Sequence, residues 1–188
     1  MPPKVKITKE DIIKTATELV RQNGEEAINA RALATALGCS TQPIFSNFAS
    51  MDELREAVVA SGYDIYLSFL KKEFEEGRYP QYKAYGMAYI RFAEEERELF
   101  KFLFMCDRGG KDITPTSDFT ESVEMIMKAN SVSREKAELM HFEMWACVHG
   151  IATMLATSFL SLDRDRISEM LSDVYLGICL RSENDECN

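Results

Sequence analysis

Four polar side chains between positions 41 and 47 are the best candidates for recognition chemistry in this sequence. The amide of Gln42 can donate and accept hydrogen bonds at the same time, which suits the edge of an adenine base, and Thr41 offers a hydroxyl and a methyl group. Ser46 and Asn47 add another hydroxyl and amide about one helical turn later. The alternative for Gln42 is a solvated residue at a helix start.

Covalent and metal chemistry have no comparable support. Cys147 has no basic side chain in an activating position, so we expect a small buried apolar residue there. His141 and His149 are the only histidines, and no acid or cysteine at a suitable spacing completes a metal site. Because no nucleophile, base and orienting group can be assembled, the sequence predicts a protein without enzyme activity, metal or cofactor.

A helix-turn-helix is the element that we expect to position the polar residues. This motif needs a small residue where the two helices meet, a residue that tolerates positive φ in the turn, and an apolar anchor in the second helix. Ala34, Gly38 and Ile44 supply all three at workable intervals. The exposed start of the second helix enters the major groove of DNA in this motif. An ordinary pair of packed helices without a ligand is the alternative.

The whole chain is predicted to be all-α, because apolar residues recur at helical spacing and no strand-like alternation is present. Capping residues and glycines set the expected helix ends, with N-caps at Thr8, Asn29, Ser40 and Ser50 and stops at Gly24 and Gly38. The expected helices are 8–24, 29–38, 41–48, 50–76, 81–96, 98–106, 117–130, 134–160 and 164–180. Residues 107–116 are predicted to form the internal loop.

Composition and charge narrow the class of protein. With 188 residues and 46% apolar side chains, the chain can bury a core. The net charge of −9 argues against a nucleic-acid binder, but residues 1–48 hold six basic and five acidic side chains, a net charge of +1, so residues 49–188 carry −10. The number of cysteines is odd, at five, and no two form a CxxC pair, which argues against a disulfide framework, so we expect a reducing cytoplasm.

The uncharged segment 144–162 is long enough to be mistaken for a membrane span. His149, Thr153, Thr157 and Ser161 recur at every fourth residue, so they would form a polar or small stripe along a helix. We therefore expect a helix that is buried in protein and has no membrane partner.

The first 60 residues resemble the TetR-like family of transcriptional regulators in both the order and the spacing of their motif residues. The matching positions are Ile12, Ile13, Ala16, Leu19, Gly24, Arg31, Leu33, Ala34, Gly38, Cys39, Ser40, Ile44, Phe45, Phe48, Glu53 and Leu54. A weaker resemblance, Trp145 followed by His149-Gly150, is similar to a Trp-His-Gly signature in the regulatory domain of one branch of the family.

The resemblance implies a DNA-binding domain over 1–50, a helical regulatory and dimerisation domain over 51–182, and an acidic tail over 183–188. It also implies which residues contact DNA. These lie in or just before the second helix of the helix-turn-helix, or in the two helices that precede it, and they are Lys9, Arg31, Ser40, Thr41, Gln42, Phe45, Ser46 and Asn47. Free surface charge is the alternative for Lys9 and Arg31. Two residues depart from the family, because a Tyr is usual at Phe45 and a Lys at Met51, and both commonly supply phosphate contacts.

The resemblance further implies a homodimer on a palindromic operator, paired through helices 134–160 and 164–180, and a small-molecule effector that weakens DNA binding. Aromatic and Met residues suit an apolar or aromatic effector, although at helical spacing they also suit plain core. The candidate ligand-binding residues are Tyr89, Phe92, Phe104, Trp145 and His149. For His149, a buried imidazole beside the indole is the alternative. We expect a ligand-responsive repressor, or otherwise a helical ligand-binding module with weak or lost DNA binding.

Overall fold

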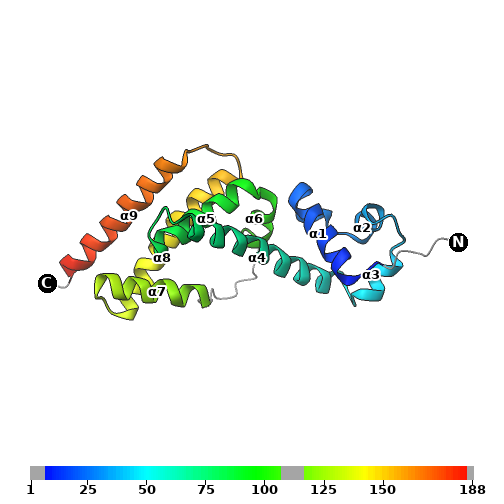
Figure 1. Cartoon of the computed structure of the whole chain (residues 1–188), viewed down its shortest axis with the longest axis horizontal. Coiled ribbons are helices and arrows are strands. Elements are labelled where there is room, and N and C mark those ends of the chain that lie inside the picture. The colour runs from blue at the N-terminus through cyan, green and yellow to red at the C-terminus, as the bar shows by residue number, and fades with distance from the viewer. Residues whose placement is uncertain (1–6, 107–116, 186–188) are drawn as a thin grey trace. The chain divides into compact units, whose positions relative to one another are not determined.

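The computed structural model describes residues 7–106 and 117–185, and within these ranges it contains nine α-helices, one short 3-10 helix and no strand (Figure 1). The predicted all-α class is therefore confirmed. The α-helices are α1 (Lys9–Asn23), α2 (Ala30–Ala36), α3 (Gln42–Asn47), α4 (Met51–Glu76), α5 (Gln81–Glu95), α6 (Arg97–Phe104), α7 (Ser117–Asn130), α8 (Arg134–Ala156) and α9 (Arg164–Asp185), and the 3-10 helix is Glu25–Ala27.

The described residues form two compact units. The first comprises residues 7–68 and 95–106, and the second comprises 69–94 and 117–185. Helix α4 contributes to both, and α6 belongs to the first unit together with α1, α2 and α3. The functional boundary at residue 50 stays a prediction, because compact units and functional domains need not coincide.

The first unit is organised around α1. Its residues Ile12, Ala16 and Val20 are spaced by four, lie on one face and are fully buried. This face contacts α2, α3 and α6. Thr8 forms the predicted capping box at the start of α1, where its hydroxyl accepts from the Asp11 N–H at 3.1 Å and its own N–H donates to the Asp11 carboxylate at 2.9 Å.

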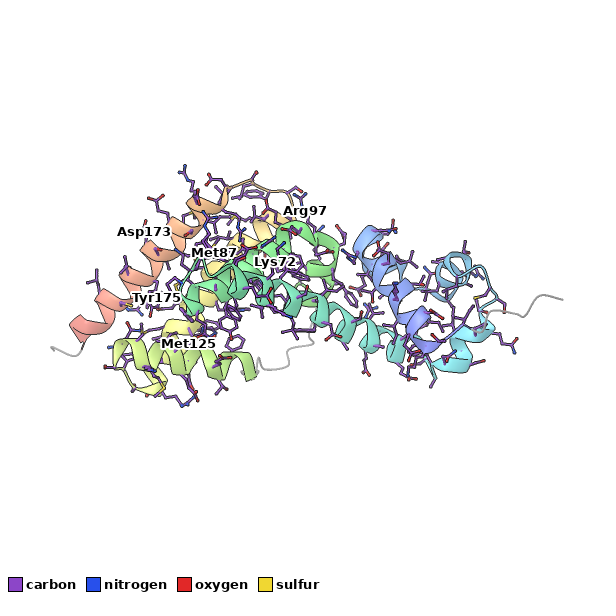
Figure 2. All side chains as sticks on the ribbon, in the orientation of Figure 1. Lys72, Met87, Arg97, Met125, Asp173 and Tyr175 are labelled. Carbon is purple, nitrogen blue, oxygen red and sulfur yellow. The ribbon has the colours of Figure 1, made fainter. Side chains whose placement is uncertain are left out.

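The second unit packs α5 against α8 and α9. Gly86 lies in the middle of α5, where an added Cβ would stand 3.1 Å from Val148 on α8 and 3.6 Å from Leu171 on α9. A side chain at this position would therefore crowd Val148 and would be in ordinary van der Waals contact with Leu171. Helix α7 packs along α8. Figure 2 shows the side chains of this unit on the ribbon, with Met87 of α5 and Tyr175 of α9 labelled.

A buried carboxylate joins three helices of the second unit. Glu73 near the end of α4 has no exposed surface, and one nitrogen of Arg164 donates to its two oxygens at 2.9 and 2.8 Å. Arg91 of α5 lies 3.6 Å from the same carboxylate and 3.3 Å from Glu76. A buried charge is tolerated only when it is paired, so these contacts hold α4, α5 and the start of α9 together.

Two predicted helix ends in the second unit were wrong. Helix α8 ends at Ala156 and not at 160, because the Thr157 hydroxyl donates back to the Thr153 carbonyl at 2.8 Å and Ser158 adopts a positive φ of 56°. Thr157 and Ser161 therefore lie outside the helix, and the predicted stripe stops at Thr153. Helix α9 runs to Asp185, beyond the predicted end at 180.

The predicted loop 107–116 and the last residues of the predicted tail, 186–188, lie outside the described residues. Within residues 7–106 and 117–185, no helix combines the length and the hydropathy that crossing a membrane requires.

Candidate nucleic-acid interface

Helices α2 and α3 form a helix-turn-helix whose turn depends on Gly38. Its φ is +64°, its N–H donates to the Thr35 carbonyl at 3.2 Å, and the next N–H, of Cys39, donates to the Ala34 carbonyl at 2.9 Å. This pair of hydrogen bonds is a Schellman end, which favours glycine in the left-handed position. Asn29 caps the other end of α2, as predicted, and accepts a hydrogen bond at 2.9 Å.

The predicted cap of α3 was wrong. The N-cap is Thr41 and not Ser40, and the Thr41 side chain makes no capping hydrogen bond. Pro43 in the first turn has no N–H, and the Ile44 N–H already donates to the Thr41 carbonyl at 3.1 Å. The donors that a cap side chain usually binds, on the second and third residues of the helix, are therefore absent at Pro43 and already paired at Ile44.

Helix α3 has one buried side and one exposed side. Ile44 has no exposed surface and Phe48, directly after the helix, is 2% exposed, so these two residues anchor α3 in the first unit. Gln42, Phe45 and Ser46 are exposed, and the exposed fraction of Phe45 reaches 54%. The anchors fix the helix while its opposite side stays available to a partner.

Hydrogen bonds within α3 distinguish three of the four polar candidates. The Ser46 hydroxyl donates to the Gln42 carbonyl at 2.9 Å, and the Asn47 amide donates to the Pro43 carbonyl at 2.7 Å. These two side chains therefore already use donors inside the helix. The Gln42 side chain makes no hydrogen bond to the described part of the chain, so its donor and acceptor are both available for direct readout.

The two predicted phosphate contacts differ in their surroundings. Lys9 pairs with Glu53, with a nitrogen–oxygen distance of 3.0 Å, and its ammonium lies 4.6 Å from the centre of the Phe48 ring. An exposed ion pair of this kind is weak, about 0–1 kcal/mol, so a phosphate could replace Glu53. Arg31 is exposed, and its guanidinium has no ion pair among residues 7–106 and 117–185.

The start of α4 is occupied by protein groups. The Ser50 hydroxyl accepts from the Glu53 N–H at 3.1 Å, and the Glu53 carboxylate accepts from the Ala49 N–H at 2.7 Å. The Ala49 hydrogen bond, and after it the Lys9 ammonium, lower the pKa of Glu53 below its usual value. A negative charge thus already lies where a phosphate would meet the helix N-terminus.

Three of the five predicted ligand-binding residues lie together in the second unit. The Tyr89 hydroxyl lies 2.9 Å from Nδ1 of His149, and the Trp145 ring stacks on the His149 ring with centroids 5.0 Å apart and planes at 11°. Phe92 is also in this unit, where it is fully buried and meets Phe69 edge to face at 5.4 Å. We call Tyr89, Trp145 and His149 the aromatic cluster.

The fifth predicted ligand-binding residue, Phe104, belongs to the first unit. Its ring meets Tyr63 and Tyr66 edge to face, both at 5.7 Å, and lies 5.4 Å from Phe100. These contacts place Phe104 in a separate group of rings.

A second tyrosine–histidine pair, which the sequence reasoning missed, lies beside the aromatic cluster on the same two helices. The Tyr82 hydroxyl lies 3.0 Å from Nδ1 of His141, and Phe119 of α7 meets the His141 ring edge to face at 4.7 Å. Burial lowers the pKa of His141 from 6.5 to about 4, so the imidazole is neutral near pH 7. The spacing of these residues in the sequence could have indicated the second pair. Tyr82 and Tyr89 are about two helical turns apart, and so are His141 and His149, so two helices packed side by side can form both pairs.

Among the described side chains, no group of three His, Cys, Asp or Glu residues could hold a metal ion. What the arrangement offers is an anchored helix with an exposed recognition side in one unit, and paired aromatic and imidazole rings in the other.

Comparisons with known proteins bear on the family and the fold of the chain. The model of the tetracyclin repressor-like C-terminal domain family matches residues 82–175, which is half of the chain. An uncharacterized HTH-type transcriptional regulator of Mycobacterium tuberculosis is 23% identical over 168 residues, covering 86% of this chain and 77% of that protein. The crystal structure of a TetR-like transcriptional regulator from Rhodococcus sp. RHA1 matches with a TM-score of 0.59 and 14% identity over 98% of both chains, so it shares the fold.

Proposed function

Because this chain belongs to the tetracyclin repressor-like family of transcriptional regulators, we propose that it is a cytoplasmic, ligand-responsive repressor. It binds a palindromic operator as a homodimer and leaves it when a small apolar or aromatic effector binds. The observation that carries this proposal is α3, which is anchored by Ile44 and presents Gln42 with an uncommitted amide. The family consists of transcriptional regulators rather than enzymes.

Operator binding is tested by selecting bound fragments from the source genome and titrating them with the protein at several salt concentrations. The proposal expects a salt-dependent shift, with a modest slope because the DNA-binding half is only weakly basic. Gln42→Ala should weaken binding to the selected fragment. Gln22→Ala makes the same chemical change on α1, where the amide donates to Glu18 at 2.7 Å, and should leave binding unchanged.

Exposed apolar side chains on α8 and α9 support the homodimer. Leu139 and Phe142 on α8 are 53% and 55% exposed, and Leu176 and Leu180 on α9 are 58% and 61% exposed. Large exposed apolar residues concentrated on two helices are typical of a protein–protein interface. Leu180→Glu should convert dimers into monomers in sedimentation velocity, whereas Leu67→Glu, at a position that is 49% exposed on α4, should not.

The aromatic cluster supports an effector with an apolar or aromatic body. Trp145 is the only tryptophan, so its fluorescence reports directly on the cluster. An effector that binds there should change this fluorescence and release the operator over the same concentration range. Tyr89→Phe removes the hydroxyl that meets His149 but keeps the ring, so it should shift both curves together. Two curves that move separately would argue against an effector site at the cluster.

The alternative function is a ligand-binding module with weak or lost DNA affinity. Three observations favour it, namely the Lys9–Glu53 ion pair, the missing hydroxyl at Phe45 and the half-buried Met51 where the family usually has Lys. A protein of this kind would respond to an effector through Trp145 but would shift neither genomic fragments nor random DNA at low salt.

A further inference from the structure

We propose that Phe45 reads the methyl group of a thymine in the operator, which makes it a specificity-determining residue of the proposed DNA-binding function. The inference rests on that function. It starts from an apolar residue, Phe45, that is 54% exposed on the recognition side of α3, next to the polar side chains of Gln42 and Ser46.

The position of Phe45 on the helix matches that of Gln42. The two residues are three apart and both exposed, so they lie on the same side of α3, with Cβ atoms about 5–6 Å apart. Base pairs follow one another at about 3.4 Å, so this separation spans one to two base-pair steps. If Gln42 pairs with an adenine, the thymine that Phe45 meets lies within about two base pairs of it.

The chemistry of the ring restricts what it can recognise. Phe45 has no hydroxyl, so it cannot donate a hydrogen bond to a phosphate oxygen or to a base edge. The C5-methyl of thymine is the apolar group that B-DNA presents in the major groove, and phenylalanine is among the residues that contact it. Within the described chain the ring of Phe45 meets no other aromatic ring, so its exposed surface is available for this contact.

The test uses a duplex selected by the full-length protein from a randomised library. Each thymine of the selected site is replaced, one position at a time, by deoxyuridine, which pairs identically but lacks the methyl group. Affinities are measured for the unaltered protein, for Phe45→Ala and for Gln42→Ala. Because Phe45 and Gln42 are exposed, both variants should fold, which circular dichroism checks.

The expected result is that each half-site contains one thymine whose replacement weakens binding by the unaltered protein about fourfold. This loss corresponds to ~0.8 kcal/mol, the transfer free energy of one carbon group. The same replacement should have no effect on Phe45→Ala and should keep its full effect on Gln42→Ala. An equal loss for the unaltered protein and for Phe45→Ala, or no sensitive thymine at all, would overturn the inference while leaving DNA binding intact. A failure to select any duplex would overturn the proposed function together with it.

Discussion

Replacing Gly38 by alanine tests whether the turn of the helix-turn-helix is held by backbone conformation alone. An added Cβ would meet no atom within 4 Å, so no steric clash contributes. The folded state then loses stability only because alanine must adopt the left-handed conformation at φ +64°, which costs about 1–2 kcal/mol for an L-residue. Alanine also restricts the unfolded chain, which returns about 0.4–1 kcal/mol. The free energy of unfolding should therefore fall by about 1 kcal/mol.

Gly77 provides a matched control in the second unit. Its φ is +60°, and an added Cβ there would likewise meet no atom within 4 Å. Gly77→Ala should therefore lower the free energy of unfolding by about the same 1 kcal/mol, because alanine has the same conformational cost there. Urea denaturation followed by circular dichroism measures both losses.

DNA binding should separate the two variants. In Gly38→Ala, the turn can relieve about 1 kcal/mol of strain by leaving the conformation that binds DNA. The smaller population of the binding conformation raises the Kd by up to about fivefold for each half-site. Gly77→Ala should leave the Kd of the selected duplex unchanged. Equal weakening by both substitutions, or a Gly38→Ala protein as stable as the unaltered one, would refute the reasoning.

Three further changes test other parts of the structure. Gln42→Ala should cost about 1–3 kcal/mol on the selected duplex and little on random DNA in a competition titration, and equal losses would contradict base readout. Glu73→Gln should lower the free energy of unfolding by up to about 3–5 kcal/mol in urea, because the Arg164 charge loses its partner, and a neutral effect would show that the buried pair contributes little. His141 has a pKa of about 4 in the folded protein against 6.5 unfolded, so the unfolded chain binds its proton first as the pH falls. Stability should be full above pH 6.5 and decrease towards pH 4, by at most about 3 kcal/mol and by less with solvent screening, and His141→Asn should flatten that part of the curve.

Local signals predicted the first unit well. The Thr8 and Asn29 caps and the Gly38 turn act over three to five residues, so the sequence contains the groups that make each hydrogen bond. The cap at Ser40 failed where two local rules compete. Pro43 removes an N–H from the first turn of α3, and the helix then starts from the Thr41 backbone.

Contacts between distant segments were harder to predict. The Tyr82–His141 and Tyr89–His149 pairs join residues 59 and 60 positions apart, and only the packing of α5 on α8 brings them together. The end of α8 depends on Ser158, a non-glycine residue in a left-handed conformation that sequence patterns rarely indicate. The partner of Lys9, Glu53, lies on α4 and could not be read from the spacing of either residue.

The central claim is that the exposed side of α3 reads a specific DNA sequence. The most direct measurement is the fluorescence anisotropy of a labelled duplex, selected by the protein, compared with a duplex of scrambled sequence at the same salt concentration. The account predicts that the unaltered protein binds the selected duplex at least about a thousandfold more tightly. Equal affinity for the two duplexes would contradict it.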